Sequence, residues 1–186
     1  MLSYFLQCST QIDFSQGLRL GSAALRTFFD KLIINRKCME LILNNSDLDE
    51  STVNHLSQSL SINETIQVLS LSSFKIKDNC CQHLAEMLRY NRDLACLCLC
   101  DNQITDRGMT DLVNALTTKK TLKWLNVFNN SINQCVTPIC ELLKENRTLQ
   151  GFNLSGNKLS KEGRLRIFAA MHKNAQSTFD EKLLLV

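Results

Sequence analysis

The sequence predicts an α/β solenoid, in which short parallel strands form one wall of a coil and helices form the other. The first observation is a block of apolar residues that recurs five times, at steps of 28, 28, 28 and 27 residues. The second is a change of apolar spacing inside every block, from every second residue to every third or fourth, as expected for a strand followed by a helix. Units of this length bury their apolar faces only by stacking on their neighbours, so we expect one continuous core.

The first half of each block is the expected strand. The aligned segments are 38–48, 65–76, 93–104, 121–132 and 148–159. Their shared inward positions are Leu41, Leu69, Leu97, Leu125 and Phe152, followed by Leu43, Leu71, Leu99, Val127 and Leu154. Because side chains alternate along a strand, we expect the residues between these positions on the opposite, outward face.

The second half of each block is the expected helix. Its apolar pairs at helical spacing are Leu56 and Leu60, Leu84 and Leu88, Leu112 and Leu116, Ile139 and Leu143, and Ile167 and Met171. The helical segments close at Asn35, Asn63, Asn91 and Asn146, with Lys119 in the same place once.

A weaker unit precedes the five blocks. Ile12 and Phe14 predict a first strand, and its helix is expected to bury Leu25, Phe28, Phe29 and Leu32. We therefore expect a single domain over residues 1–186, with an N-terminal capping repeat at 1–36, five repeats of 27–28 residues at 37–174, and a C-terminal cap or tail at 175–186. Terminal units of a solenoid must seal its ends, which is the role we expect for both.

The blocks resemble the leucine-rich repeat pattern L-x-x-L-x-L-x-x-N-x-L, and their length with a full helix is similar to that of the ribonuclease-inhibitor subfamily. The asparagine of the pattern stands at Asn102, Asn130 and Asn157, whereas Ser46 and Phe74 replace it in the earlier blocks. The resemblance implies a curved right-handed coil with a parallel sheet on its concave face and helices on its convex face. It also implies a protein that acts by binding another protein.

Composition argues against several classes of partner. The 21 basic and 18 acidic residues are scattered, and no basic tract would follow a phosphate backbone, so we expect no nucleic acid. No apolar run approaches the ~20 residues of a membrane-spanning helix, and the start lacks the pattern of a secretory signal, so we expect no membrane. Nine cysteines without scaffold spacing favour free thiols in a cytoplasmic setting. The composition also resembles that of bacterial effectors delivered to a host cytosol, for which the tail would be either a translocation signal or a capping strand.

The segment CLCLC places Cys96, Cys98 and Cys100 side by side on the outward face of one expected strand. Residues two apart on a strand are ~6.6 Å apart, whereas zinc draws its thiolates within ~4 Å of each other, so we expect small contact residues rather than a metal or redox centre. The three histidines fall in the expected helices, on the other side of the core, which excludes a Cys/His nucleophilic pair. We expect no catalytic residue, no metal and no cofactor.

The outward strand positions form the candidate binding surface. It has few charges, a central apolar strip and the only tryptophan of the chain. The predicted contact residues are Glu40, Ile42, Val68, Ser70, Cys96, Cys98, Cys100, Asp101, Trp124, Asn126, Phe128 and Asn153. An open surface of this apolar character indicates that another molecule covers it.

The leading hypothesis is a non-catalytic protein-binding module whose concave face covers a folded domain or loop of its partner, such as an enzyme, and so inhibits or regulates it. Six strands make a wall roughly 25 Å across, which suits the ~800 Å² that a standard complex buries on each side. Two alternatives remain open: a regulator similar to the leucine-rich GTPase-activating proteins, and a structural or adaptor module of a larger assembly. We expect a monomer when the protein is free.

Overall fold

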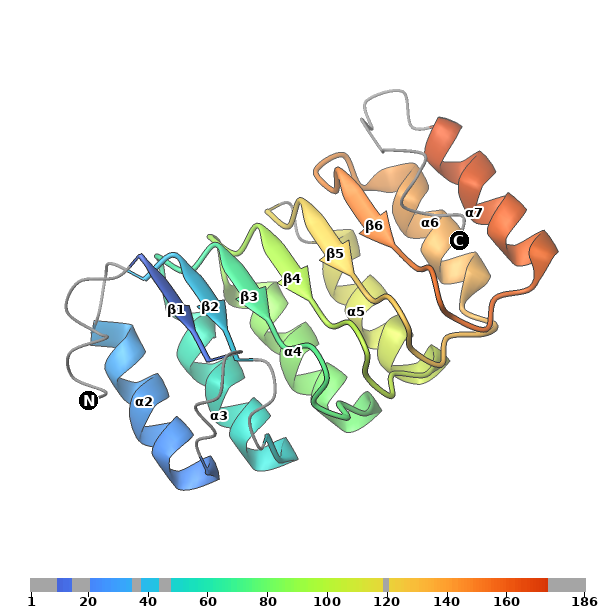
Figure 1. Cartoon of the computed structure of the whole chain (residues 1–186). Helices are drawn as coiled ribbons and strands as arrows, with labels where there is room; N and C mark the ends of the chain where they lie inside the picture. Colours follow the sequence, from blue (N-terminus) through green and yellow to red (C-terminus); the bar gives the residue numbers. More distant parts are fainter. Residues whose placement is uncertain (1–9, 15–20, 35–37, 44–47, 119–120, 174–186) are drawn as a thin grey trace.

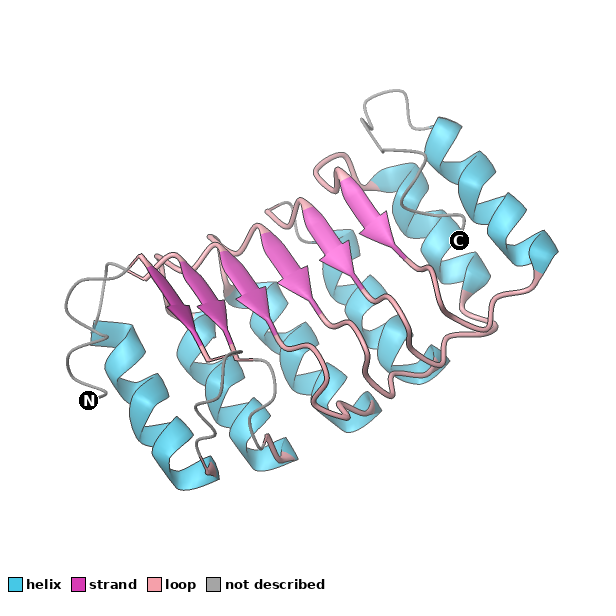
Figure 2. Cartoon of the chain, in the orientation of Figure 1, coloured by secondary structure: helices cyan, strands magenta, loops and turns pink. Residues whose placement is uncertain are grey.

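The computed structural model describes residues 10–14, 21–34, 38–43, 48–118 and 121–173. Figure 1 shows strands and helices alternating along the chain, and Figure 2 shows that the described helices all lie on one side of the sheet. The strands are β1 (Gln11–Asp13), β2 (Glu40–Ile42), β3 (Val68–Ser70), β4 (Cys96–Cys98), β5 (Trp124–Asn126) and β6 (Gly151–Asn153). They form one parallel sheet in chain order, which confirms the predicted solenoid of strand and helix units.

The register of the sheet pairs each inward residue with its equivalent in the next unit. Leu41 pairs with Leu69, Leu69 with Leu97, and Leu97 with Leu125. All of these side chains are buried, so a single apolar column runs through the solenoid. Each unit gains its core from the units beside it, as the sequence predicted.

The helices are α2 (Ser22–Ile34), α3 (Glu50–Ser61), α4 (Asp78–Tyr90), α5 (Asp106–Thr118), α6 (Val136–Glu145) and α7 (Lys161–Lys173). Each described leucine pair sits on the face toward the sheet: in α4, for example, both Leu84 and Leu88 are buried. Consecutive helices pack against one another along the whole array. None of the described helices has the length and apolar character needed to cross a membrane.

Two ladders of asparagines join successive units. In the loops after the strands, Asn130 accepts a hydrogen bond from the backbone N–H of Ile104 at 3.0 Å and donates to the carbonyl oxygen of Leu99 at 2.9 Å. Beyond the helices, Asn91 donates to the carbonyl oxygens of Leu60 and Asn63 at 2.6 and 3.0 Å. These amides satisfy backbone groups that the turns of the solenoid would otherwise bury unpaired.

The asparagine ladder in the loops after the strands lacks its asparagine in the unit of β3. Phe74 is buried at the asparagine position and fills it with an apolar ring, while its backbone N–H donates to the side chain of Asn102 in the next unit at 3.1 Å. The other departure from the pattern, Ser46, lies outside the described residues, as do Asn35 and Lys119 of the helix-end series.

A left-handed residue follows each of four strands and turns the chain toward its helix. The residues with positive φ at these equivalent positions are Ser73, Asp101, Asn129 and Gly156. Asparagine, aspartate and glycine tolerate this conformation better than other residues do.

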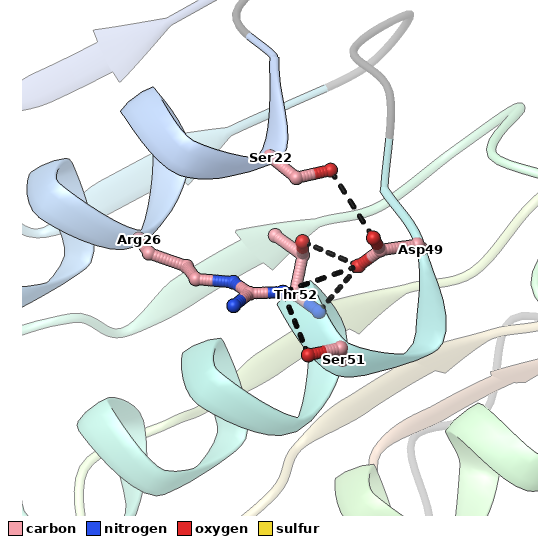
Figure 3. Close-up of polar contacts among 5 residues, drawn as sticks. All are labelled: Ser22, Arg26, Asp49, Ser51 and Thr52. Atoms are coloured by element: carbon pink, nitrogen blue, oxygen red, sulfur yellow. Dashed lines mark hydrogen bonds and ion pairs between the residues drawn. The ribbon is translucent and has the colours of Figure 1, made fainter.

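Polar side chains join α2 to the start of α3 (Figure 3). Asp49 caps α3 by accepting from the backbone N–H of Thr52 at 2.7 Å and from its hydroxyl at 2.6 Å. From α2, Ser22 donates to the same carboxylate at 3.3 Å, and Arg26 donates to Ser51 at 2.7 Å. The hydrogen bonds from Thr52 lower the pKa of the Asp49 carboxyl.

The first unit is a strand and a helix, as predicted. Ile12 of β1 is buried, and Phe14 packs edge-on against Phe28 of α2 with ring centroids 5.2 Å apart. The side chain of Leu32 and the tail 174–186 lie outside what the structure describes. The predicted domain boundaries and the capping role of the tail therefore stay predictions.

Candidate functional site

The side of the sheet away from the helices is the candidate site, and we call it the strand face. Its first column joins Glu40, Val68, Cys96, Trp124 and Gly151 through the register, and its second joins Ile42, Ser70, Cys98, Asn126 and Asn153. The structure thus aligns these predicted contact residues as the sequence expected. Most of them are half-buried, which is typical of an open sheet surface.

Two aromatic side chains project from this surface. Trp124 is 41% exposed and Phe128 is 39% exposed. Both lean on a glycine of the next unit: a Cβ on Gly151 would stand 1.9 Å from Cε3 of Trp124, and a Cβ on Gly156 would stand 3.3 Å from Cε2 of Phe128. Sequence reasoning found the two rings but missed that the Trp124 ring occupies the space left by the missing side chain of Gly151.

Three of the predicted contacts lie beyond the strand ends. Phe128 follows β5, Cys100 follows β4, and Asp101 lies in the turn after β4 with a φ of 56°. The exposed Asp101 carboxylate accepts a hydrogen bond from the side-chain amide of Asn129 at 2.7 Å. Asp101 therefore belongs to the row of turns that borders the strand face, with its charge beside the neighbouring unit.

The cysteines of the strand face differ from the sequence expectation in one respect. The sulfur atoms of Cys98 and Cys100 lie 3.0 Å apart, whereas the spacing along a strand had suggested that the thiols would be well separated. That expectation was wrong because it used backbone spacing. Cysteine side chains that lean along the chain bring their sulfurs much closer than their Cα atoms, and β4 ends at Cys98, so Cys100 is no longer held in the strand.

The hydrogen bond between Cys98 and Cys100 shifts the pKa values of the two thiols in opposite directions. The Cys100 thiol donates to Cys98, and this is the main reason that the pKa of Cys98 is lowered to about 5, with further donation from the Ser72 hydroxyl at 3.3 Å. The same hydrogen bond raises the pKa of Cys100. Burial raises the pKa of Cys96, on the same face. The three cysteines of CLCLC are therefore chemically distinct.

The other described cysteines are buried thiols. They are Cys38, Cys80, Cys81, Cys135 and Cys140. Burial raises the pKa of each of them, to about 11 for Cys38. All eight described cysteines are free, and Cys8 lies outside the described residues.

The histidines belong to the helical side of the molecule. His55 lies 2.8 Å from a carboxylate oxygen of Asp30 on α2, and His83 lies 3.6 Å from one of Glu50 on α3. Each of these pairs joins two consecutive helices and is far from the strand-face cysteines in the fold. In the described part of the chain, no group of three or more His, Cys, Asp or Glu residues is placed to hold a metal ion.

The surface carries two hollows that the sequence analysis did not identify. An open one of about 630 Å³ lies where α3 and α4 end, between the exposed side chains of Ile62 and Tyr90 and beside Arg92. A smaller one of about 160 Å³ lies at the start of β2 and β3 and includes Glu40 and Val68. Ile62 and Tyr90 stand one repeat apart in the sequence, but their exposure is known only from the structure.

Comparison with known proteins gives one family match. The profile of the TMOD/LMOD leucine-rich domain matches residues 32–135, a stretch that contains every predicted contact residue except Asn153. A search of curated protein sequences gives no match.

Solved structures share the fold. Leiomodin-1 actin-binding site 2 superposes with a TM-score of 0.70 at 24% identity, over 79% of this chain and 87% of that one. The tropomodulin C-terminal domain of Caenorhabditis elegans gives 0.63 at 15% identity, over 84% of this chain and 95% of that one. An internalin (inlF) of Listeria monocytogenes gives 0.52 at 18% identity, over 91% of this chain and 46% of that one.

Proposed function

Because this chain belongs to the TMOD/LMOD leucine-rich domain family, whose profile matches residues 32–135 of its 186, we propose that it is a non-catalytic protein-binding module. Its working surface is the strand face, the face predicted to be concave. The helices occupy the other side of the sheet, where ion pairs join consecutive helices, and the strand face exposes two large aromatic side chains to a partner.

The observation that carries this proposal is the pair of exposed aromatic rings. Trp124 is the only tryptophan of the chain, and it stands with Phe128 on a surface whose other members include Ile42, Val68 and the three cysteines. Large aromatic side chains carry much of the binding energy of protein interfaces, because they bury a large area and lose little side-chain entropy. The exposed rings therefore mark the expected centre of the contact.

Actin is the partner we propose. The structurally similar leiomodin-1 domain is named as an actin-binding site, and this chain covers 87% of it. Four of the six described strands lie inside the stretch that the family profile matches, and this stretch contains both rings. The sequence predicted a folded domain or loop as the partner, bound to a sheet roughly 25 Å across, and an actin subunit is a folded domain.

The manner of action that we propose is occlusion. A rigid sheet that covers one face of its partner keeps other proteins from that face, which would make this protein a regulator of its partner. A partner that is an enzyme, a ribonuclease-inhibitor-like subfamily, and delivery into a host cytosol all remain predictions from the sequence.

The experiment that tests the partner is a titration of purified monomeric actin into the full chain by isothermal titration calorimetry. Association with one actin per chain at micromolar or tighter affinity, which corresponds to about −8 kcal/mol, is the expected result. Absence of heat in this titration, together with absence of co-sedimentation with actin filaments, would exclude actin as the partner.

A further inference from the structure

Two neighbouring thiols on the strand face are arranged for chemistry that binding does not require. The sulfurs of Cys98 and Cys100 are 3.0 Å apart, and the Ser72 hydroxyl lies 3.3 Å from Cys98. Both cysteines are half-buried, so small solutes reach them while the surrounding chain holds them in place. No other pair of described cysteines has its sulfurs in hydrogen-bond contact on an accessible face.

We propose that Cys98 and Cys100 form a peroxide-sensitive dithiol, a modification site at which hydrogen peroxide converts the two thiols to a disulfide. This site is additional to partner binding. For partner binding alone, Cys98 and Cys100 would serve only as small apolar contact residues.

Cys98 is the thiol that reacts first. Its sulfur is in hydrogen-bond contact with the Cys100 thiol and the Ser72 hydroxyl, and donation from these two groups favours its thiolate. The thiolate attacks one oxygen of hydrogen peroxide and breaks the O–O bond. Cys98 becomes a sulfenic acid, and the other oxygen leaves as hydroxide, which takes a proton to form water.

Cys100 is the thiol that resolves the sulfenic acid. Its pKa is raised by the proton that it shares with the Cys98 thiolate, and oxidation of Cys98 removes that cause. Its sulfur then attacks the Cys98 sulfur, the S–O bond breaks, and the Cys98 hydroxyl leaves with the Cys100 proton as a second water. A disulfide bond is ~2.05 Å long, so closure brings the sulfurs about 1 Å nearer than they already are.

The structure also says which cysteines do not take part. Cys96 lies on the same strand and is equally accessible, but burial raises its pKa and it has no sulfur partner. Cys80 and Cys81 are neighbours in sequence, yet both are buried in α4, and the sulfur of Cys81 lies against Gly108 of α5. Among the eight described cysteines, oxidation at low peroxide is therefore expected at one pair. Because that pair is open to solvent, its disulfide is expected to be readily reduced by a small dithiol.

The experiment treats the reduced, folded full chain with a small excess of hydrogen peroxide, blocks the remaining thiols with N-ethylmaleimide and digests with trypsin. Cleavage after Arg92 and Arg107 yields one peptide, 93–107, that contains Cys96, Cys98 and Cys100. We expect this peptide to lose two hydrogen atoms and to carry one maleimide, on Cys96, and to recover all three labels after dithiothreitol. Dimedone, which traps sulfenic acids, reports the first step.

Three single variants separate the roles. Cys100→Ser should retain the first step and accumulate dimedone-reactive Cys98, whereas Cys98→Ser should react about tenfold more slowly or less. Cys96→Ser is the matched control and should form the disulfide at the wild-type rate. Peptide 93–107 that keeps three maleimide-reactive thiols while peroxide oxidises added glutathione would overturn the proposal, and so would dimedone labelling of Cys96 at the rate of Cys98. No partner protein enters this test, so its failure is distinct from failure of the proposed function.

Discussion

The indole ring of Trp124 lies over Gly151, its register partner on β6, in the space that a side chain at position 151 would occupy. A Cβ there would stand 1.9 Å from Cε3 and 2.0 Å from Cζ3 of the ring. The absence of a side chain on β6 therefore sets the orientation of the largest side chain on the strand face. A ring held in this way presents a fixed surface, which lowers the entropy lost when a partner binds.

Replacing Gly151 by alanine is expected to displace this ring. Because Trp124 is 41% exposed, the indole can rotate toward solvent, so the free energy of unfolding should fall by less than about 2 kcal/mol. Trp124 is the only tryptophan, so its emission maximum reports the change directly and should shift to longer wavelength. Gly21→Ala, where a Cβ meets nothing within 4 Å, is the control and should leave the spectrum unchanged. An unshifted spectrum for Gly151→Ala would contradict the contact.

The core column predicts a large difference between inward and outward strand residues. Leu97→Ala and Leu125→Ala each remove a buried side chain from between two units and should cost ~2 to 5 kcal/mol of unfolding free energy in urea titrations. Asn126→Ala loses a hydrogen bond from the backbone N–H of Phe128 at an exposed site and should cost about 1 kcal/mol or less. A larger cost for Asn126→Ala than for the leucines would mean that the two faces of the sheet are assigned the wrong way round.

The asparagine ladder predicts a second stability effect. Asn130→Ala leaves the backbone N–H of Ile104 and the carbonyl oxygens of Leu99 and Val127 without their side-chain partner. Buried backbone groups without partners cost ~1 to 3 kcal/mol, which thermal unfolding will detect. Asn114→Ala on the exposed surface of α5 should be neutral or slightly stabilising, since alanine is the better helix former. Equal effects of the two changes would contradict the ladder.

The Cys98 and Cys100 pair predicts an unusual pH dependence of alkylation. Since the hydrogen bond from Cys100 lowers the pKa of Cys98, its thiolate forms at lower pH than an ordinary cysteine thiolate, and its rate of reaction with iodoacetamide should level off at correspondingly lower pH. Cys96, whose pKa is raised above its ordinary value of 9.0, should still be gaining reactivity at pH 9. Cys100→Ala removes the main donor and should move the Cys98 midpoint upward. Mass spectrometry of peptide 93–107 measures the alkylation of each cysteine. Identical pH profiles for Cys96 and Cys98 would contradict the hydrogen bond between Cys98 and Cys100.

The repeat made much of this architecture predictable. Leu41, Leu69, Leu97 and Leu125 recur at one period, and burial is the same physical requirement in every unit, so the register and the outward columns followed from the sequence. The buried residues Ile12 and Phe14 were likewise predictable, although their unit departs from the pattern.

Features that depend on side-chain orientation were not predictable. The 3.0 Å distance between the Cys98 and Cys100 sulfurs depends on the orientations of the two side chains. The position of the Trp124 ring over Gly151 depends on a contact between neighbouring units. The hollow beside Tyr90 depends on how two helix ends stand relative to each other. Periodicity specifies which face a residue occupies and leaves these distances undetermined.

The measurement that tests the account most directly is the affinity of actin for four variants of the strand face and its surroundings, by calorimetry. Trp124→Ala, Phe128→Ala and the charge-introducing Cys98→Arg should each weaken the complex by roughly thirtyfold or more, the equivalent of ~2 kcal/mol, and the two aromatic variants should keep melting temperatures close to that of the parent chain. Tyr90→Ala, at the hollow between the helix ends, is the matched aromatic control and should bind as the parent does. Unchanged affinity in the three strand-face variants, with loss of binding in Tyr90→Ala, would place the interface at the helix ends and contradict the claim that this protein binds through its strands.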